Sequence, residues 1–229
     1  MRRPDLARLP RPVRLPLYLL GGWLGVFAVV QVTTVVAGAA ARGAGKDPQL
    51  RADGWPAITH LRMVGEGDDA VVFGAQPTLA DYRALADQGV TTVIDLRENS
   101  PSPGNPNRDD PAALAELGID YHPLPVIDGE APSRDEIDEF LRIVDDADGI
   151  VFAHCSGGVG RSTTFAAIVQ ASRGQDPSVL EQVAVGPPTI EQMWFVGTLR
   201  PGEPRHRITP VVAVVSRVID FPRRIWGLL

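Results

Sequence analysis

The sequence is poor in lysine and in cysteine, and each shortage excludes classes of chemistry. Of its 22 basic residues only Lys46 is a lysine, and it does not lie in a Walker-type phosphate loop, so a nucleotide site of that kind is excluded. Schiff-base chemistry lacks a suitable lysine for the same reason. Cys155 is the only cysteine among 229 residues, which excludes intrachain disulfides and multi-cysteine zinc sites. We expect neither a metal nor another cofactor.

Charge is distributed unevenly along the chain. Residues 1–53 carry eight basic and three acidic side chains, and residues 205–229 carry five and one. Residues 54–204 carry nine basic and 24 acidic side chains. An acidic body repels the phosphates of nucleic acid, so we expect no nucleic-acid partner, whereas the basic ends are attracted to anionic membrane surfaces. The alternative is that the acidic side chains simply form solvated helix faces.

A long uncharged segment follows the basic segment 1–14. No charged side chain occurs in residues 15–41, which as a helix would span about 40 Å, more than the ~30 Å hydrocarbon core of a bilayer. The segment therefore predicts a single transmembrane anchor. More basic residues precede it than follow it, so we expect a cytoplasmic N-terminus and an extracytoplasmic catalytic domain. The alternatives are a signal peptide, cleaved near Ala37-Gly38-Ala39, and a buried core helix.

The body of the chain alternates between apolar runs and helical segments. Residues 42–56 predict a linker, because they are rich in Gly, Ala, Asp and Pro, and residues 57–204 predict one domain. We expect strands at 70–73, 90–96, 119–122 and 150–153, and helices at 78–88, 111–117, 133–146, 160–173, 177–185 and 189–199. This order predicts an α/β fold with a mainly parallel central sheet flanked by helices.

The C-terminal tail, residues 205–229, has a different character. Six valine and isoleucine side chains recur at helical spacing between residues 211 and 219, with arginines around them. A basic amphipathic helix of this kind either lies in the membrane interface beside the anchor or docks its apolar stripe on the body.

One stretch carries the chemistry: His154-Cys155-Ser156-Gly157-Gly158-Val159-Gly160-Arg161-Ser162. It follows an apolar strand and opens a helix, so several backbone N–H groups converge on one spot and form a cradle for a phosphate-sized anion. Those groups and the helix dipole favour a thiolate at Cys155. The planar guanidinium of Arg161 suits two phosphoryl oxygens. The alternative is a buried, inert cysteine beside a turn.

The same stretch resembles the signature of cysteine-dependent protein tyrosine and dual-specificity phosphatases, which is His-Cys, five residues, then Arg and Ser or Thr. Residues 74–173 resemble the bacterial dual-specificity type, including Gly74-Ala75-Gln76-Pro77 and residues 121–128. The resemblance implies a dual-specificity phosphatase-like fold in which Cys155 attacks phosphorus and Asp128 protonates the leaving oxygen. Glu130, its neighbour, is the alternative acid.

The resemblance also implies roles for the other residues of the stretch. Arg161 would hold the phosphoryl group together with Ser156, Gly157, Gly158, Val159, Gly160 and Ser162, and Ser162 would also assist the departing thiolate. His154 would orient the loop, unless it is only a satisfied buried histidine. Asp95 and Arg97 resemble a family pair near the site, and equally fit a buried structural ion pair.

The predicted function is a membrane-anchored phosphatase that hydrolyses phosphotyrosine, and also phosphoserine or phosphothreonine, through a phosphocysteine intermediate. No basic residue lies between Cys155 and Arg161, which disfavours highly phosphorylated head groups. A phospholipid or other phosphate ester is the alternative substrate, because a domain outside the cytoplasm meets few phosphoproteins. A phosphate-binding module without catalysis is a further alternative. A rhodanese fits the loop poorly, and low-molecular-weight phosphatases and arsenate reductases carry their loop near the N-terminus.

Overall fold

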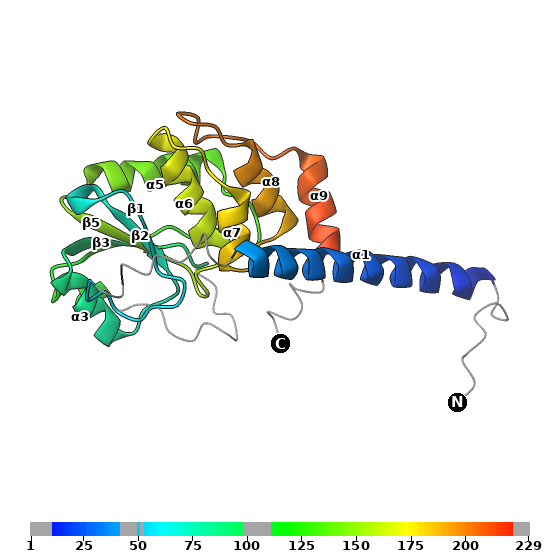
Figure 1. Cartoon of the computed structure of the whole chain (residues 1–229), viewed down its shortest axis with the longest axis horizontal. Coiled ribbons are helices and arrows are strands. Elements are labelled where there is room, and N and C mark those ends of the chain that lie inside the picture. Colours follow the sequence, from blue (N-terminus) through cyan, green and yellow to red (C-terminus); the bar gives the residue numbers. More distant parts are fainter. Residues whose placement is uncertain (1–10, 42–49, 51–52, 99–110, 222–229) are drawn as a thin grey trace.

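A five-stranded sheet lies at the centre of the fold (Figure 1). The computed structural model describes residues 11–41, 50, 53–98 and 111–221. The strands are β1 (Arg62–Val64), β2 (Val71–Gly74), β3 (Val90–Asp95), β4 (Asp120–Pro123) and β5 (Ile150–His154), in the order β1-β2-β5-β3-β4. All neighbours pair in parallel except β1, which is antiparallel to β2. The predicted mainly parallel α/β sheet is therefore confirmed. The edge strand β1 was not predicted, because three residues are too few to show an alternating pattern.

Helices cover both faces of this sheet, with α3 on one face and α5 and α6 on the other (Figure 1). In chain order the helices are α1 (Arg11–Ala41), the 3-10 turn η2 (Gly67–Asp69), α3 (Leu79–Asp87), α4 (Pro111–Ala115), α5 (Arg134–Asp146), α6 (Gly160–Ser172), α7 (Val179–Val185), α8 (Ile190–Thr198) and α9 (Pro210–Ile219). The N-cap residues of α3, α5 and α8 are Thr78, Ser133 and Thr189. Each forms a capping box with the residue three positions later. Residues 99–110, between β3 and α4, lie outside the described residues.

Two apolar clusters form the core, one on each face of the sheet. Phe73 on β2 belongs to the cluster under α5 and α6, whereas Val72, its neighbour, belongs to the other cluster. This is the expected alternation of side chains along a strand. Leu50 and Trp55 are buried in the second cluster, so packing begins upstream of residue 57, within the segment predicted as a linker.

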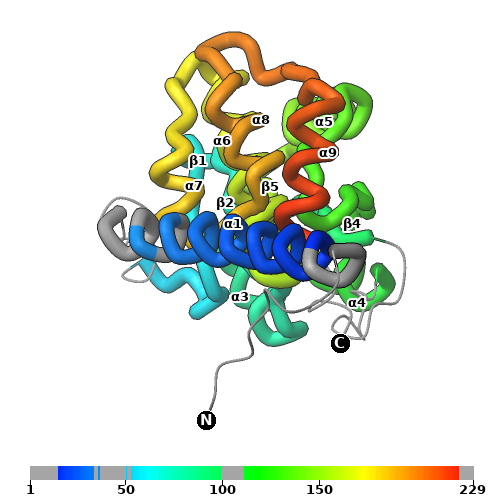
Figure 2. Tube along the Cα trace, turned by 90° about the vertical axis from the view of Figure 1, so that its right-hand side faces the viewer, coloured from blue at the N-terminus to red at the C-terminus, as the bar shows by residue number. Residues whose placement is uncertain are grey.

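Helix α1 extends beyond the body at its N-terminal end, and further along it lies against α7 and α9 (Figures 1 and 2). Its segment Leu15–Thr33 has the length and hydropathy of a membrane span, and none of it is buried. The alternative of a buried core helix is therefore wrong. A span and a signal sequence both share these properties.

Helix α9 packs on α8 mainly through polar residues. Ser216 and Asp220 are buried, whereas the side chains of Val211, Val214, Val215 and Val218 are exposed. Helix α9 therefore docks on the body through buried polar side chains, whereas one interpretation of the sequence expected an apolar stripe. The valines face outward instead, on the helix that contacts α1.

Candidate active site

Residues 155–161 form the phosphate loop, which leads from the carboxyl end of β5, the middle strand of the sheet, into the first turn of α6. In open parallel sheets, ligands bind beyond the carboxyl ends of the strands. Gly158 has a φ of +69°, and a Cβ atom there would lie 2.6 Å from the backbone nitrogen of Ala75. Only glycine fits this position, so the close approach between loop and β2 depends on it.

The Cys155 thiol lies at the floor of this loop and is buried. Its Sγ atom accepts hydrogen bonds from the Gly158 N–H at 3.2 Å and from Ser162 Oγ at 3.1 Å. Ser162 Oγ also lies 3.0 Å from the carbonyl oxygen of Gly74. A hydroxyl has one proton, so Ser162 donates either to the carbonyl or to the sulfur. A negative charge on sulfur draws that proton to the thiolate.

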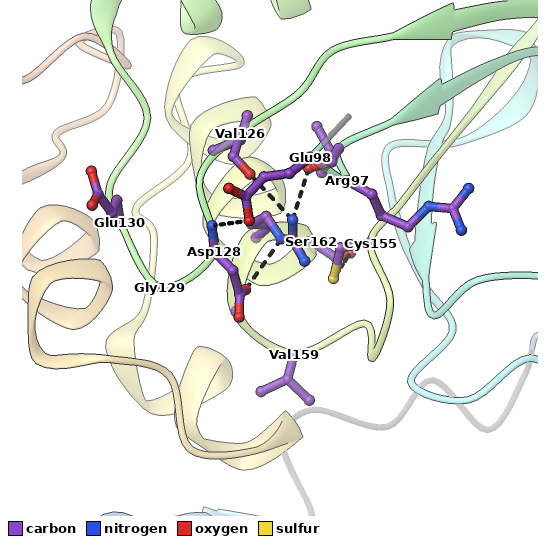
Figure 3. A network of polar contacts seen from close by, with 12 residues as sticks. Arg97, Glu98, Val126, Asp128, Gly129, Glu130, Cys155, Val159 and Ser162 are labelled. Atoms are coloured by element: carbon purple, nitrogen blue, oxygen red, sulfur yellow. Dashed lines mark hydrogen bonds and ion pairs between the residues drawn. The ribbon is translucent and has the colours of Figure 1, made fainter. Parts of the chain in front are cut away.

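The other loop residues predicted to bind substrate line the same turn. Ser156 and Gly157 are exposed, and Val159 and Gly160 are half-buried. The Ser156 carbonyl accepts from the backbone N–H of Gln76 at 3.3 Å, which ties the loop to the end of β2. Figure 3 shows Val159 on the side of the loop near Asp128.

Arg161 is buried beneath this loop and connects it to two others. Its Nη1 donates to the carbonyl oxygens of Leu96 and Val126, both at 3.2 Å. Leu96 follows β3, and Val126 stands two residues before Asp128. The Nε atom lies 3.3 Å from Asp128 Oδ1. The guanidinium therefore sets the distance between the phosphate loop and the loop that carries the candidate acid.

The two candidate acids point in different directions (Figure 3). The side chain of Asp128 is 72% exposed and extends toward the phosphate loop, where it pairs with Arg161. Its backbone N–H donates to Glu98 Oε2 at 3.3 Å. Glu130 turns away and binds Arg217 at 2.7 Å. Only Asp128 therefore lies beside the arginine of the phosphate loop.

A buried polar network lies beside the phosphate loop, at the ends of β3 and β5. His154 is fully buried, with Nε2 3.0 Å from the Tyr82 hydroxyl and Nδ1 4.0 Å from Asp95 Oδ1. Asp95 accepts from Arg97 at 2.7 Å and from the Tyr121 hydroxyl at 2.8 Å. Burial raises the pKa of Asp95, but the hydrogen bonds from Arg97 and the charge of His154 outweigh it, so this pKa lies below 3.8. The pair Asp95–Arg97 is thus a buried ion pair in contact with His154.

Two residues near the site were missed by the sequence reasoning. The Nη1 and Nη2 atoms of Arg62 are buried. The central carbon of this guanidinium lies 5.7 Å from the centroid of the Phe73 ring. Burial lowers the pKa of Arg62 to about 10, while the negative charges of Cys155 and Glu181 act to raise it. His60, at a φ of +58°, donates from Nδ1 to the Gly157 carbonyl at 2.9 Å. Neither residue stands in a recognisable motif, so no local signal pointed to them.

Across residues 11–41, 50, 53–98 and 111–221, no group of three or more His, Cys, Asp or Glu side chains could hold a metal ion. The donors that converge at the site are N–H groups, a hydroxyl and a guanidinium. This set suits an anion rather than a cation.

Comparison with known proteins finds a family model that covers this site. Residues 70–175 match the family model "Polymorphic toxin system, DSP-PTPase phosphatase". The chain is similar to a beta-lactamase hydrolase-like protein of Agrobacterium fabrum, with 32% identity over 99 residues, which cover 43% of this chain and 23% of that one. It is also 33% identical over 78 residues to the human dual specificity protein phosphatase CDC14C, covering 34% of this chain and 16% of that one.

Solved structures that match this chain include Tk-PTP in the active form, at 25% identity and a TM-score of 0.47, covering 61% of this chain and 93% of that one. P. aeruginosa TpbA in complex with pTyr matches at 19% identity and a TM-score of 0.46, covering 70% and 96%. Residues 70–175 are thus similar to domains of the cysteine-based dual-specificity and tyrosine phosphatase type. The chain spans less than a quarter of the length of the curated relatives it matches.

Proposed function

We propose that this protein is a cysteine-dependent phosphoric monoester hydrolase, with phosphotyrosine, and also phosphoserine and phosphothreonine, as its substrates. The observation that carries this proposal is the arrangement of three side chains. The Cys155 sulfur receives two hydrogen bonds at the N-terminus of α6, Arg161 lies in the first turn of that helix, and Asp128 Oδ1 lies 3.3 Å from Arg161 Nε. Nucleophile, anion-binding group and acid thus share one site.

In the first step the Cys155 thiolate attacks phosphorus and the bond from phosphorus to the leaving oxygen breaks. Asp128 gives its proton to that oxygen, so an alcohol or phenol leaves and Asp128 becomes a carboxylate. Proton transfer of this kind contributes typically about 10²–10⁴-fold. Arg161 and the loop N–H groups stabilise the charge on the phosphoryl oxygens. Asp128 exchanges its contact with Arg161 for one with the leaving oxygen.

In the second step water attacks the phosphocysteine, and the Asp128 carboxylate takes a proton from that water. The bond between sulfur and phosphorus breaks, and inorganic phosphate and the Cys155 thiolate result. The thiolate is the leaving group here, so a hydrogen bond from Ser162, 3.1 Å from the sulfur, stabilises it as it forms. The site returns to its starting state.

Substrate class follows from the charges around the loop. No basic side chain occurs between Cys155 and Arg161, which favours a monoester with one phosphate over a highly phosphorylated head group. A phospholipid or other non-protein phosphate ester is the second candidate. The observation that favours it is the apolar surface of α9 beside α1, which would place the body near a lipid surface.

We further propose that α1 anchors the protein in a membrane, with the domain on the extracytoplasmic side. The charge-free span and the larger number of basic residues before it support this orientation. Protease digestion of whole cells and of inverted vesicles distinguishes the two sides. Mass analysis of the mature N-terminus distinguishes an anchor from a cleaved signal sequence.

The function is tested with the full chain in detergent micelles, assayed on an aryl phosphate in the presence of a metal chelator. Cys155→Ser should abolish turnover. Asp128→Asn should lower turnover by about 10²–10⁴-fold, because the leaving oxygen then receives no proton. A folded wild type without turnover on phosphopeptides, lysophosphatidic acid or aryl phosphate, but with phosphate affinity, would identify a binding module instead.

The choice of substrate is tested on the same preparation. A phosphotyrosyl peptide, a phosphoseryl peptide and lysophosphatidic acid are compared by kcat/KM in micelles. A higher kcat/KM for the phosphotyrosyl peptide supports the proposal. A higher value for the lipid ester supports the second candidate.

A further inference from the structure

The loop that carries Asp128 is held from outside the segment that matches the phosphatase family. The first turn of α8 contacts each of the three residues that follow Asp128. These contacts run from Thr189 Oγ1 to the Gly129 carbonyl at 2.7 Å, from Gln192 Nε2 to the Glu130 carbonyl at 3.5 Å, and from the Ala131 N–H to Glu191 Oε1 at 3.1 Å. The loop therefore rests on α8 directly after its candidate acid.

Arg217 of α9 adds a charged contact to the same loop. Its Nη2 donates to Glu130 Oε2 at 2.7 Å, and its Nε lies 3.8 Å from Glu191 Oε2. The Glu191 side chain is only 4% exposed and that of Glu130 is 18% exposed. One guanidinium thus lies against two carboxylates, one from the Asp128 loop and one from α8. The Arg217 side chain itself is 48% exposed, so its attraction to the two carboxylates acts at the surface of this contact.

The position of Arg217 is itself set by its neighbours on α9. Ser216 Oγ accepts from the Glu191 N–H at 3.0 Å, and Asp220 Oδ2 accepts from the Ile190 N–H at 3.2 Å. These N–H groups belong to the first turn of α8, where no carbonyl oxygen of the helix can accept from them. The positive end of the helix dipole also favours the carboxylate of Asp220 there. Because α9 caps α8 in this way, Arg217 is directed at the Asp128 loop.

We propose that Arg217 is a positioning residue for the general acid. By bridging Glu130 and Glu191 it holds residues 128–131 against α8, with Asp128 facing the phosphate loop. The proposal rests on the proposed function, in which Asp128 protonates the leaving group. It makes α9, which lies outside residues 70–175, a part of the catalytic unit.

The test compares two aryl esters with the full chain in detergent micelles. Phenyl phosphate has a leaving group that needs a proton, whereas 2,4-dinitrophenyl phosphate has one that leaves as the anion. Arg217→Ala should lower kcat for phenyl phosphate by about tenfold or more, part of the 10²–10⁴-fold that an acid supplies, and change kcat for the dinitrophenyl ester by less than about twofold. Arg217→Lys should recover part of the loss, because it keeps the charge.

Arg205→Ala is the matched control. Arg205 also connects the tail to the body, through an ion pair with Asp138 on α5, but it does not contact the Asp128 loop. Arg205→Ala should leave kcat unchanged for both esters. In an Asp128→Asn background, Arg217→Ala should cause no further loss on phenyl phosphate, because a positioning residue acts only through the group it positions. Equal losses on both esters, no loss on either, or additivity with Asp128→Asn would overturn the proposal.

A second variant and a second readout keep the outcome clear. Arg217→Ala removes the positive charge that lies 3.8 Å from the buried Glu191, so Arg217→Ala is repeated together with Glu191→Gln. The glutamine still accepts from the Ala131 N–H, and the double variant should show the same selective loss. Hydrogen exchange of residues 127–133 should be faster in both variants than in wild type. If the wild type turns over neither ester, the proposed function fails, and unchanged exchange in this segment would overturn the positioning role separately.

Discussion

Alanine at Gly158 tests the shape of the phosphate loop, with Gly157 as an internal control. Gly158 has a φ of +69°, and an alanine in this left-handed region costs about 1–2 kcal/mol. Its Cβ atom would also lie 2.6 Å from Ala75 N and 2.8 Å from the carbonyl carbon of Gly74. Both atoms are backbone, so the conflict is relieved only if the loop or the end of β2 moves. At Gly157 a Cβ atom would meet nothing within 4 Å.

This movement should reduce both stability and turnover. The lower bound on stability is the backbone cost of about 1–2 kcal/mol, which corresponds to roughly 2–8 °C in Tm for a chain of this size. The Gly158 N–H donates to Cys155 Sγ, so a shifted loop also misplaces the nucleophile and its anion donors. Misplacement on the order of 1 Å lowers turnover by about 10²-fold.

Thermal unfolding, kcat on 4-nitrophenyl phosphate and inhibition by vanadate measure these effects. Gly157→Ala should unfold near the wild-type temperature, because its Cβ atom meets no other protein atom within 4 Å. If Gly158→Ala unfolds at the wild-type temperature and binds vanadate like Gly157→Ala, the loop does not approach β2 as described, and the reasoning about its anion cradle fails.

Three further predictions follow from the core, the buried ion pair and the loop hydroxyl. Phe140 is fully buried, 4.6 Å from the Phe165 ring centroid, so Phe140→Ala should lower the free energy of unfolding by about 3–5 kcal/mol in urea titrations, against less than about 1.5 kcal/mol for Phe140→Leu. Asp95→Asn should destabilise by about 3–5 kcal/mol at pH 7, because Arg97 loses its partner charge. Because the folded-state pKa of Asp95 is lowered, the difference in the free energy of unfolding between wild type and Asp95→Asn should have its full size above pH 3.8. The difference should vanish as the pH falls through the folded-state pKa, and a difference that stays constant with pH would contradict this prediction. Ser162→Ala should slow breakdown of the phosphocysteine by about 10–100-fold, seen as a burst of phenol in stopped-flow assays, and single-phase kinetics would argue against that role.

Local patterns predicted the elements well, because each is specified by residues near one another in sequence. Buried strands such as Val90–Asp95 are short apolar runs, and Ser133 and Glu136 form the capping box that a helix start requires. The phosphate loop was equally visible, since a strand, a glycine-rich turn and a helix follow one another without interruption. Its residues stand together in the fold as they stand in the chain.

Contacts between distant segments left no such signal. Thr189 meets Gly129 across 60 residues and Arg217 meets Glu130 across 87, and no spacing rule connects those positions. For the same reason the sequence favoured Asp128 as the acid but kept Glu130 as an alternative. Two carboxylates on one short loop are distinguished only by what each one faces, which here is Arg161 for Asp128 and Arg217 for Glu130.

The tail shows how these long-range contacts change the meaning of a segment. Its valines suggested a helix that serves the membrane or the packing of the body, whereas its polar residues bind α8 and the Asp128 loop. On its other side, α9 receives a hydrogen bond of 2.6 Å from Trp23 Nε1 to the Val218 carbonyl. One short helix thus contacts both the apolar N-terminal helix and the loop of the candidate acid. Under the proposed positioning role, an enzyme that ends at residue 204 lacks Arg217, so it should retain the nucleophile and the anion cradle while losing turnover selectively on esters whose leaving group needs a proton.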